Sequence, residues 1–278
     1  MNRFLVFTLI LVGLEFSIAP AALSQSDYQV VTVSNPGTIK GSVKWKGAVP
    51  SPLTLPISKN PEVCDPESQK VRNLERLIVG PTAGVANTVV YLKNISQGKP
   101  LEIPQQFRSL DQRTCRYQPH ILLVPLNGEL DMKSSDPLLH NVHMSGGASY
   151  NLPFPIKDQV ISRTMHQAGL ISISCNAGHV WMNGEILVVP HPYYTVTDES
   201  GNFELTDVPP GDYEIEAWHE GWHIAREEVA YDVTTQQKVK RPIFSDPLAW
   251  DSNVTVAPSA TQTVNFEISE SNGHSARP

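Results

Sequence analysis

The sequence predicts an all-β protein built from Greek-key β-sandwiches, and three observations support this class. Short runs of alternating apolar and polar residues recur along the chain, as strands with one buried face require. Turn residues separate the runs at close intervals, with 17 Gly and 23 Pro among 278 residues. No segment has a long helical or heptad period. Short strands joined by closely spaced turns are typical of a β-sandwich.

The first residues predict a secretory signal peptide over residues 1–24. Arg3 gives a positive start, an apolar stretch follows from Phe4 to Leu14, and Ala22-Leu23-Ser24 offers a small-residue cleavage site. No later segment is long and apolar enough to cross a membrane. We therefore expect a periplasmic or secreted protein without a membrane span.

The alternating runs follow one another along most of the chain. Predicted strands cover residues 38–45, 89–92, 120–124, 203–205, 213–218 and 263–268. Two further apolar runs, at 170–173 and 186–189, predict a pair of strands joined by a short loop.

Residues 195–218 hold the most regular of these patterns. The segment 198–201 predicts a hairpin turn, Phe203 and Leu205 point to one face, and Pro210-Gly211 reverses the chain. The segment resembles the carboxypeptidase regulatory-like, prealbumin-like module. The resemblance implies a structural or adhesive β-sandwich with no catalytic groups of its own.

That module normally begins with strands like those at 37–43 and 87–92, which here lie far upstream. We therefore expect a split sandwich, with its first part at 37–112, its second part at 191–270 and another unit inserted between them. Two or three β units in simple succession are the alternative, because either order satisfies the turn and alternation patterns. Residues 271–278 are expected to form a disordered tail.

The loop after the strand at 170–173 carries three potential metal ligands, Cys175, His179 and Met182. A thiolate, an imidazole and a thioether suit copper, and a His₂Cys set with a weak axial Met is found in blue-copper electron-transfer sites. His140 is the best candidate for the second imidazole. The alternative is that Cys175 is a small buried hydrophobe and Met182 a core residue.

Residues 113–190 resemble a cupredoxin, most closely the plastocyanin and amicyanin type. The resemblance rests on the segment 115–128, the run Asp136-Pro-Leu-Leu-His140-Asn141 and the loop that ends at Met182. It implies that Asn141 braces the ligand loop. It also implies one type 1 copper ion with the ligands His140, Cys175, His179 and Met182.

The ligand loop departs from the amicyanin pattern at one point. Three residues separate Cys175 from His179, where amicyanin-like loops have two. This spacing is similar to the second half of the binuclear copper-A loop of terminal oxidases. That loop has another Cys four residues earlier, where this sequence has Ile171. A mononuclear site is therefore implied.

Three cysteines in an exported protein suggest one disulfide and one remaining thiol. Cys64 and Cys115 are the expected pair, and the alternative is that both are reduced and buried. An unpaired thiol is a liability in an oxidising compartment, and metal binding would protect Cys175.

Two further histidines are weaker metal candidates. His143 follows His140 by three residues, and it could simply be a hydrogen-bonded polar group. His219 lies in the run Trp218-His219-Glu220 at the end of a predicted strand. It could belong to a second metal site or a relay near the copper. The alternative is an aromatic strand end with an exposed polar tip.

The charge and the motifs limit the function classes. A formal net charge of −7 without a basic patch argues against nucleic acid as a partner. No hydrolase motif occurs, so the sequence predicts a carrier and not an enzyme. We expect electron transfer with a protein partner such as a cytochrome or a dehydrogenase. The alternatives are a copper-, carbohydrate- or protein-binding module without redox turnover, and a zinc-containing or metal-free structural protein.

Overall fold

The computed structural model describes residues 28–102 and 108–276 and consists almost entirely of β-strands. Within these ranges, the four residues of α1 (Pro61–Cys64) form the single α-helix. The prediction of an all-β sandwich protein is confirmed. The expected signal peptide at 1–24 lies outside the described residues. No helix in the described part of the chain is long and apolar enough to span a membrane.

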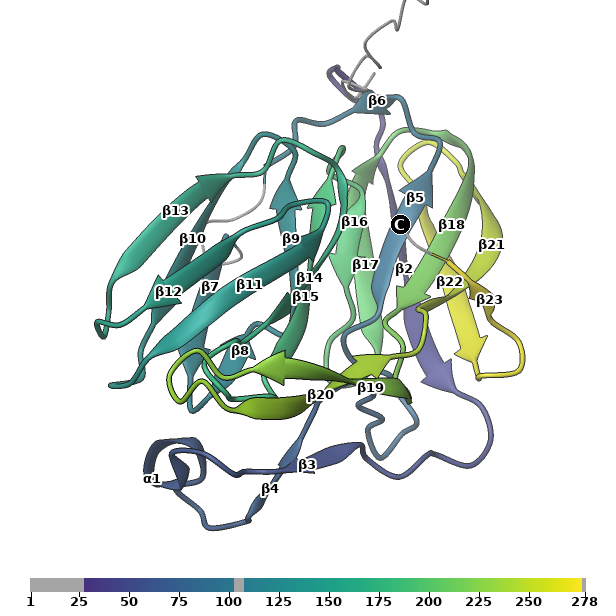
Figure 1. The fold of residues 1–278 in the computed structure, drawn as a ribbon. Coiled ribbons are helices and arrows are strands. Elements are labelled where there is room, and N and C mark those ends of the chain that lie inside the picture. Colours follow the sequence, from purple (N-terminus) through teal and green to yellow (C-terminus); the bar gives the residue numbers. More distant parts are fainter. Residues whose placement is uncertain (1–27, 103–107, 277–278) are drawn as a thin grey trace, which may run out of the picture.

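One sandwich is formed by residues 108–189 and is called the insert sandwich below (Figure 1, teal). Its two sheets enclose a core that includes Leu110, Phe154 and Ile186. The five-stranded sheet has the order β12 (Asn151–Phe154), β11 (His140–Gly146), β14 (Gly169–Ser174), β15 (Asn183–Val189) and β9 (Ile121–Pro125). The four-stranded sheet has the order β13 (Val160–Thr164), β10 (Glu129–Ser134), β7 (Ser109–Arg113) and β8 (Arg116–Gln118).

The second sandwich takes its strands from both sides of the insert sandwich and is called the outer sandwich. β5 precedes the insert in the chain, yet it lies between β16 and β18, which follow it. The five-stranded sheet has the order β16 (Tyr194–Val196), β5 (Val89–Lys93), β18 (Gly211–His219), β21 (Leu248–Val256) and β23 (His274–Ser275). The three-stranded sheet has the order β17 (Asn202–Val208), β2 (Gly37–Trp45) and β22 (Thr261–Ile268).

The apolar residues of the alternating pattern are buried in the structure, and the polar residues between them are mostly exposed. In β17, Phe203 and Leu205 point into the outer core while their neighbours are exposed. A turn forms before this strand as predicted, and Asp198 Oδ1 accepts the backbone N–H groups of Ser200 at 2.9 Å and Asn202 at 2.8 Å. The expected hairpin is wrong, because the flanking strands β16 and β17 belong to different sheets. Gly201 in this turn has a φ of 79°, a conformation that glycine adopts without strain.

β15 is apolar from Ile186 to Val189 because both faces of this part of the strand are buried. Ile186 and Val188 face the core of the insert sandwich, whereas Leu187 and Val189 pack with Trp218 in a cluster between the two sandwiches. Burial on both sides of a strand requires a continuous apolar run. The two sandwiches therefore share an apolar interface beside the strand that follows the ligand loop.

Two boundaries expected from the sequence are wrong. We placed the start of the inserted unit at residue 113, but β7 begins at Ser109 and pairs in parallel with β10. We also expected a disordered tail at 271–278, but His274 and Ser275 pair with Ala249 and Leu248 at the edge of the outer sandwich. These polar segments lack an alternating pattern, and their backbone hydrogen bonds to distant strands decide their structure.

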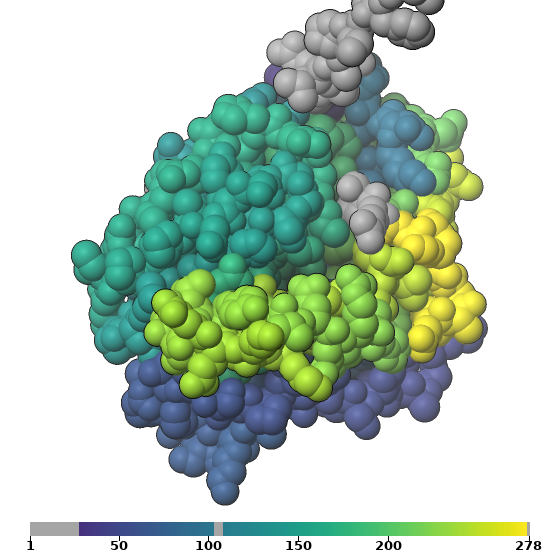
Figure 2. Space-filling view, viewed as in Figure 1, coloured from purple at the N-terminus to yellow at the C-terminus, as the bar shows by residue number. Residues whose placement is uncertain are grey.

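Short two-stranded pairs project from the sandwiches. β19 (Ile224–Tyr231) and β20 (Lys238–Phe244) form a hairpin that crosses the front of the molecule as a continuous band (Figures 1 and 2). The remaining pairs are β3 (Thr54–Pro56) with β4 (Val71–Asn73), and β1 (Gln29–Val30) with β6 (Gln97–Gly98). The β3–β4 segment carries α1 and half of the disulfide.

Candidate metal centre

The predicted ligand loop is held between two paired strands. Ser174 at the end of β14 pairs with Asn183 at the start of β15, so residues 175–182 connect neighbouring strands. His140 begins β11, and β11 pairs with β14 through His143 and Ser174. Sheet hydrogen bonds therefore bring His140 beside Cys175.

Three of the predicted ligands lie together in the interior. The Cys175 Sγ atom is 3.9 Å from His140 Nδ1 and 3.7 Å from His179 Nδ1. The three donor atoms all lie within 4.8 Å of one another. Cys175 and His140 are fully buried, and His179 is 1% exposed. The cluster is therefore compact and closed to water.

These distances fit a metal ion between the three donors. Bonds of about 2.3 Å to sulfur and about 2.0 Å to nitrogen would place the two atoms about 3.7 Å apart at an angle of about 120°. The observed separations of 3.9 and 3.7 Å are close to this value. Thiolate with two imidazoles is also the donor set that copper and zinc prefer.

Each histidine is held by a second polar group at its other ring nitrogen. His140 Nε2 lies 2.9 Å from Asp136 Oδ2, and His179 Nε2 lies 3.1 Å from Asn60 Oδ1. In a neutral ring, an N–H donated at Nε2 leaves Nδ1 with the lone pair that a metal ion needs, and such partners fix the orientation of metal-binding histidines. Asp136 also accepts the backbone N–H groups of Thr114 and Cys115, each at 2.8 Å.

The surroundings favour the thiolate form of Cys175. Burial alone would raise the pKa of the thiol, but hydrogen bonds and charges from His140 and His179 outweigh it and lower the pKa to about 6. The pKa of His140 is raised, because its bonds to Asp136 and Cys175 outweigh the opposing effect of burial. A deprotonated sulfur is the form that binds metal.

Met182 is buried at the end of the same loop. Its backbone N–H donates to the carbonyl of His179 at 2.9 Å, which closes a turn inside the loop, and its side chain is 2% exposed. The side chain packs in the core of the insert sandwich. Its axial role toward a metal stays a prediction.

The predicted disulfide is confirmed and lies next to the cluster. Cys64 and Cys115 are bonded across 51 residues. The Sγ atoms of both lie within 4.8 Å of a His179 ring nitrogen. Trp181 donates its indole N–H to the Cys115 carbonyl at 3.2 Å and packs edge-on against His179. The disulfide thus ties the β3–β4 segment to the metal cluster.

Two segments outside the insert sandwich cover the ligand loop. Lys59 donates to the Ala177 carbonyl at 2.8 Å and forms an ion pair with Asp232 in the β19–β20 hairpin. From the same hairpin, the Val233 N–H donates to the Asn176 carbonyl at 3.0 Å. Arg241 donates to the Cys175 carbonyl at 3.0 Å. Sequence reasoning missed this cover, because no local pattern marks residues that meet across more than 50 positions.

The weaker predicted site residues lie in different places. Asn141 Oδ1 accepts the N–H of Asn176, directly after Cys175, a contact that braces the loop. His143 is half-buried beside Ser174 Oγ at 3.4 Å. His219 is fully buried, with Nδ1 2.9 Å from the Glu220 carbonyl oxygen and Nε2 without a hydrogen-bond partner in the described ranges. Neither His143 nor His219 belongs to a metal-ligating group among the described residues.

A buried ionic network lies between the two sandwiches. Arg76 Nη1 is 2.7 Å from Glu220 Oε2 and 3.3 Å from Glu185 Oε1. His120 hydrogen-bonds the other oxygen of Glu220. Arg76 also stacks on the Phe244 ring at 3.9 Å. The network therefore joins the loop after β4, both sandwiches and the end of β20.

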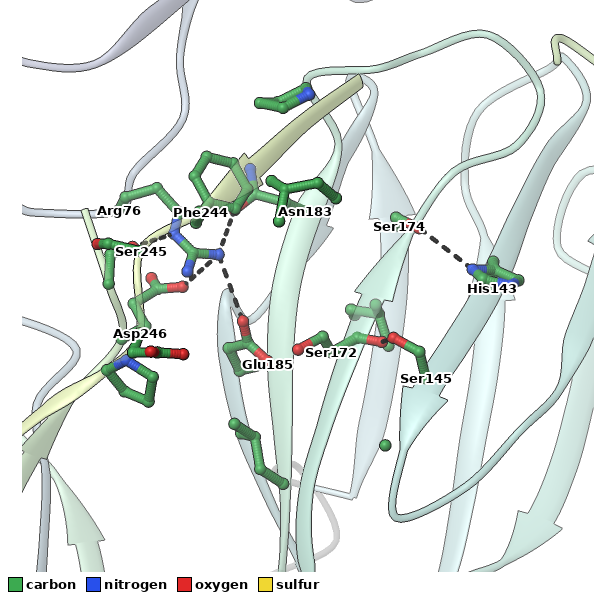
Figure 3. A pocket seen from close by; sticks show the side chains of 18 of the residues that line it. Arg76, His143, Ser145, Ser172, Ser174, Asn183, Glu185, Phe244, Ser245 and Asp246 are labelled. Atoms are coloured by element: carbon green, nitrogen blue, oxygen red, sulfur yellow. Dashed lines mark hydrogen bonds and ion pairs between the residues drawn. The ribbon is translucent and has the colours of Figure 1, made fainter. Parts of the chain in front are cut away.

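The network forms one end of a cleft of about 700 Å³ between the insert sandwich and the β19–β20 hairpin. Figure 3 shows Arg76, Asn183 and Glu185 at this end and His143 with Ser174 at the other. Serine hydroxyls on β11 and β14 line the floor between them. The cleft has a polar floor and reaches Met182 of the ligand loop.

One family model matches part of the outer sandwich. Residues 191–244 match the family model for the second β-sandwich domain of NOMO1-like subunits of the BOS complex. No curated protein matches the chain.

Solved structures of copper proteins resemble part of the chain. An oxidised point mutant of amicyanin is 26% identical, covers 29% of this chain and 80% of that chain, and gives a TM-score of 0.27. A purple cupredoxin from Nitrosopumilus maritimus is 17% identical over 29% of this chain and 98% of that chain, with a TM-score of 0.26. A Cu-containing nitrite reductase from Thermus scotoductus SA-01 is 18% identical over 34% of this chain and 24% of that chain, with a TM-score of 0.29.

The fold and the cluster together define an all-β protein of two sandwiches, one of which buries a Cys–His–His group. The similar structures each cover about a third of this chain.

Proposed function

We propose that this protein is an exported type 1 copper protein that transfers single electrons to or from a protein partner. The observation that carries the proposal is the buried triangle of Cys175 Sγ, His140 Nδ1 and His179 Nδ1. A copper ion bound there would supply a one-electron couple. The net charge of −7 disfavours nucleic acid as a partner, and a redox protein such as a cytochrome or a dehydrogenase is the proposed partner.

The residues of this chain would keep the ligand set rigid between oxidation states. Asp136 and Asn60 hold the two imidazoles from behind, and sheet pairing fixes both ends of the ligand loop. Trp181 packs against His179, so an apolar wall excludes water from one side. A rigid, dry site needs little rearrangement when one electron enters or leaves, and its surroundings tune the potential.

The test is metal analysis together with an absorption spectrum of the mature protein after loading with Cu(II). We expect one copper ion per chain and a strong visible thiolate-to-copper band that disappears on reduction. A colourless protein that retains zinc in the presence of Cu(II) would contradict the proposal. That result would favour a structural role, in which the cluster only stabilises the fold.

A binding module without redox turnover is the second candidate function. The cleft of about 700 Å³ favours it, because mixed hydroxyl, amide and charged groups line its walls and could hydrogen-bond a polar ligand such as a carbohydrate. Reversible voltammetry separates the two candidates. A binding module would hold copper without a reversible one-electron wave.

Met182→Leu is expected to leave copper bound and to raise its reduction potential. An apolar side chain cannot donate to the axial position, and loss of that donor weakens the oxidised state more than the reduced state. The shift is about 60 mV for each tenfold change in relative affinity. Protein-film voltammetry measures it. Met144→Leu is the matched control, because Met144 is similarly buried in the same core. Equal reduction potentials in both variants would mean that Met182 is a core residue and not a copper ligand.

A further inference from the structure

None of the three candidate ligands, Cys175, His140 and His179, reaches the surface. Cys175, His140 and His179 are at most 1% exposed, and Asn60 occupies the outer nitrogen of His179. Electron transfer between proteins weakens steeply with the distance between the redox centres. A partner must therefore dock close to the segments that cover the cluster.

The β19–β20 hairpin provides a direct connection from the Cys175 side of the cluster to the surface. Val233 bonds the carbonyl of Asn176, the residue after Cys175. Arg241 donates to the Cys175 carbonyl at 3.0 Å and to Asn176 Oδ1 at 2.6 Å. Only the backbone of one residue and one hydrogen bond thus lie between the ligand cysteine and the hairpin.

The outer face of this hairpin carries exposed apolar side chains. Val229 is 62% exposed and Tyr231 is 58% exposed. Neighbouring residues alternate between the faces of a strand, and Glu228 with its partner Arg241 lines the cleft on the inner side. Val233, just beyond the strand, is 55% exposed. Large apolar side chains gathered on an exposed face mark an interaction site.

The outer face of the hairpin carries two lysines, whereas the chain as a whole is negatively charged. Lys240 pairs with Val229 and Lys238 pairs with Tyr231 across the hairpin, so both lysines share the outer face with the apolar residues. Glu227 neutralises Lys240 in part through an ion pair at 3.0 Å. The chain as a whole has a net charge of −7. The outer face of the hairpin is thus a local positive site that favours an acidic partner.

We propose that the outer face of the β19–β20 hairpin is the docking surface for an acidic redox protein, with apolar contacts to Val229 and Tyr231 and charge contacts to Lys238 and Lys240. This inference rests on the proposed electron-transfer function. It adds the face that the partner uses and the charge that the partner carries.

The test measures electron transfer from the copper-loaded, reduced full chain to two small oxidants of opposite charge. The probes are hexacyanoferrate(III), an anion, and tris(phenanthroline)cobalt(III), a cation. Lys238→Glu/Lys240→Glu reverses the charge of the outer face. Lys40→Glu/Lys44→Glu is the matched control, because both lysines are exposed on β2 of the outer sandwich and the net charge changes equally.

At low ionic strength, the hairpin variant is expected to react about tenfold more slowly with hexacyanoferrate and faster with the cobalt complex. The control variant should show much smaller changes, and added salt should reduce the difference between the variants. Equal effects of the two variants would overturn the docking surface. The visible spectrum of each variant is recorded first. A wild-type protein without the blue band would overturn the proposed function itself, whereas blue variants with equal rates would overturn the docking surface alone.

Discussion

Replacing Cys175 with serine is expected to abolish the thiolate-to-copper band of the copper-loaded protein. A hydroxyl is a hard, weakly acidic group and cannot form the covalent bond that a thiolate gives to copper. The fold should persist, since serine is slightly smaller than cysteine and its hydroxyl would meet the nitrogens of His140 and His179. Absorption and metal content of the variant are the measurements.

The matched control for this experiment is His143→Gln. His143 lies on the same strand as His140 but beside Ser174 and outside the ligand cluster, so this variant should keep both the band and the copper. A serine variant that keeps the colour of the wild type would show that Cys175 is not a ligand. Loss of colour in His143→Gln would assign the second imidazole to His143 instead of His140.

Arg76→Ala is expected to lower the free energy of unfolding by about 3–5 kcal/mol. The change would leave Glu220 and Glu185 buried without their cation. It would also remove the N–H donated to the Gly221 carbonyl at 2.8 Å and the stacking on Phe244. Urea unfolding followed by fluorescence measures the loss.

Two further variants make this result specific. Arg226→Ala removes an exposed guanidinium from β19, and its effect should stay within about 0.5 kcal/mol. Adding Glu220→Gln to Arg76→Ala should recover part of the stability. The double variant no longer buries a Glu220 carboxylate that lacks the Arg76 cation. A loss below about 1 kcal/mol for Arg76→Ala would mean that the network does not hold the two sandwiches together.

The sequence by itself determined the fold class and the compact ligand loop. Alternation in segments such as 203–205 and 263–268 is a local signal, and it corresponds to the inward and outward faces of β17 and β22. The spacing of Cys175 and His179 is equally local, because strands on both sides fix a short loop. Assigning Cys175 to the metal loop left Cys64 and Cys115 as the expected disulfide pair, and the two are bonded.

Only the tertiary structure decided what surrounds the ligand cluster. Asn60 meets His179 across 119 positions and Arg241 meets Cys175 across 66, and single polar residues at such separations carry no periodic signal. The same reason explains Arg76. One of its ion-pair partners lies on β15 of the insert sandwich, and the other directly follows β18 of the outer sandwich. Backbone pairing with remote strands likewise placed β7 and β23 in segments that are polar and lack a periodic pattern. Local patterns determine which segments become strands, whereas the packing of distant segments determines which side chains close the site.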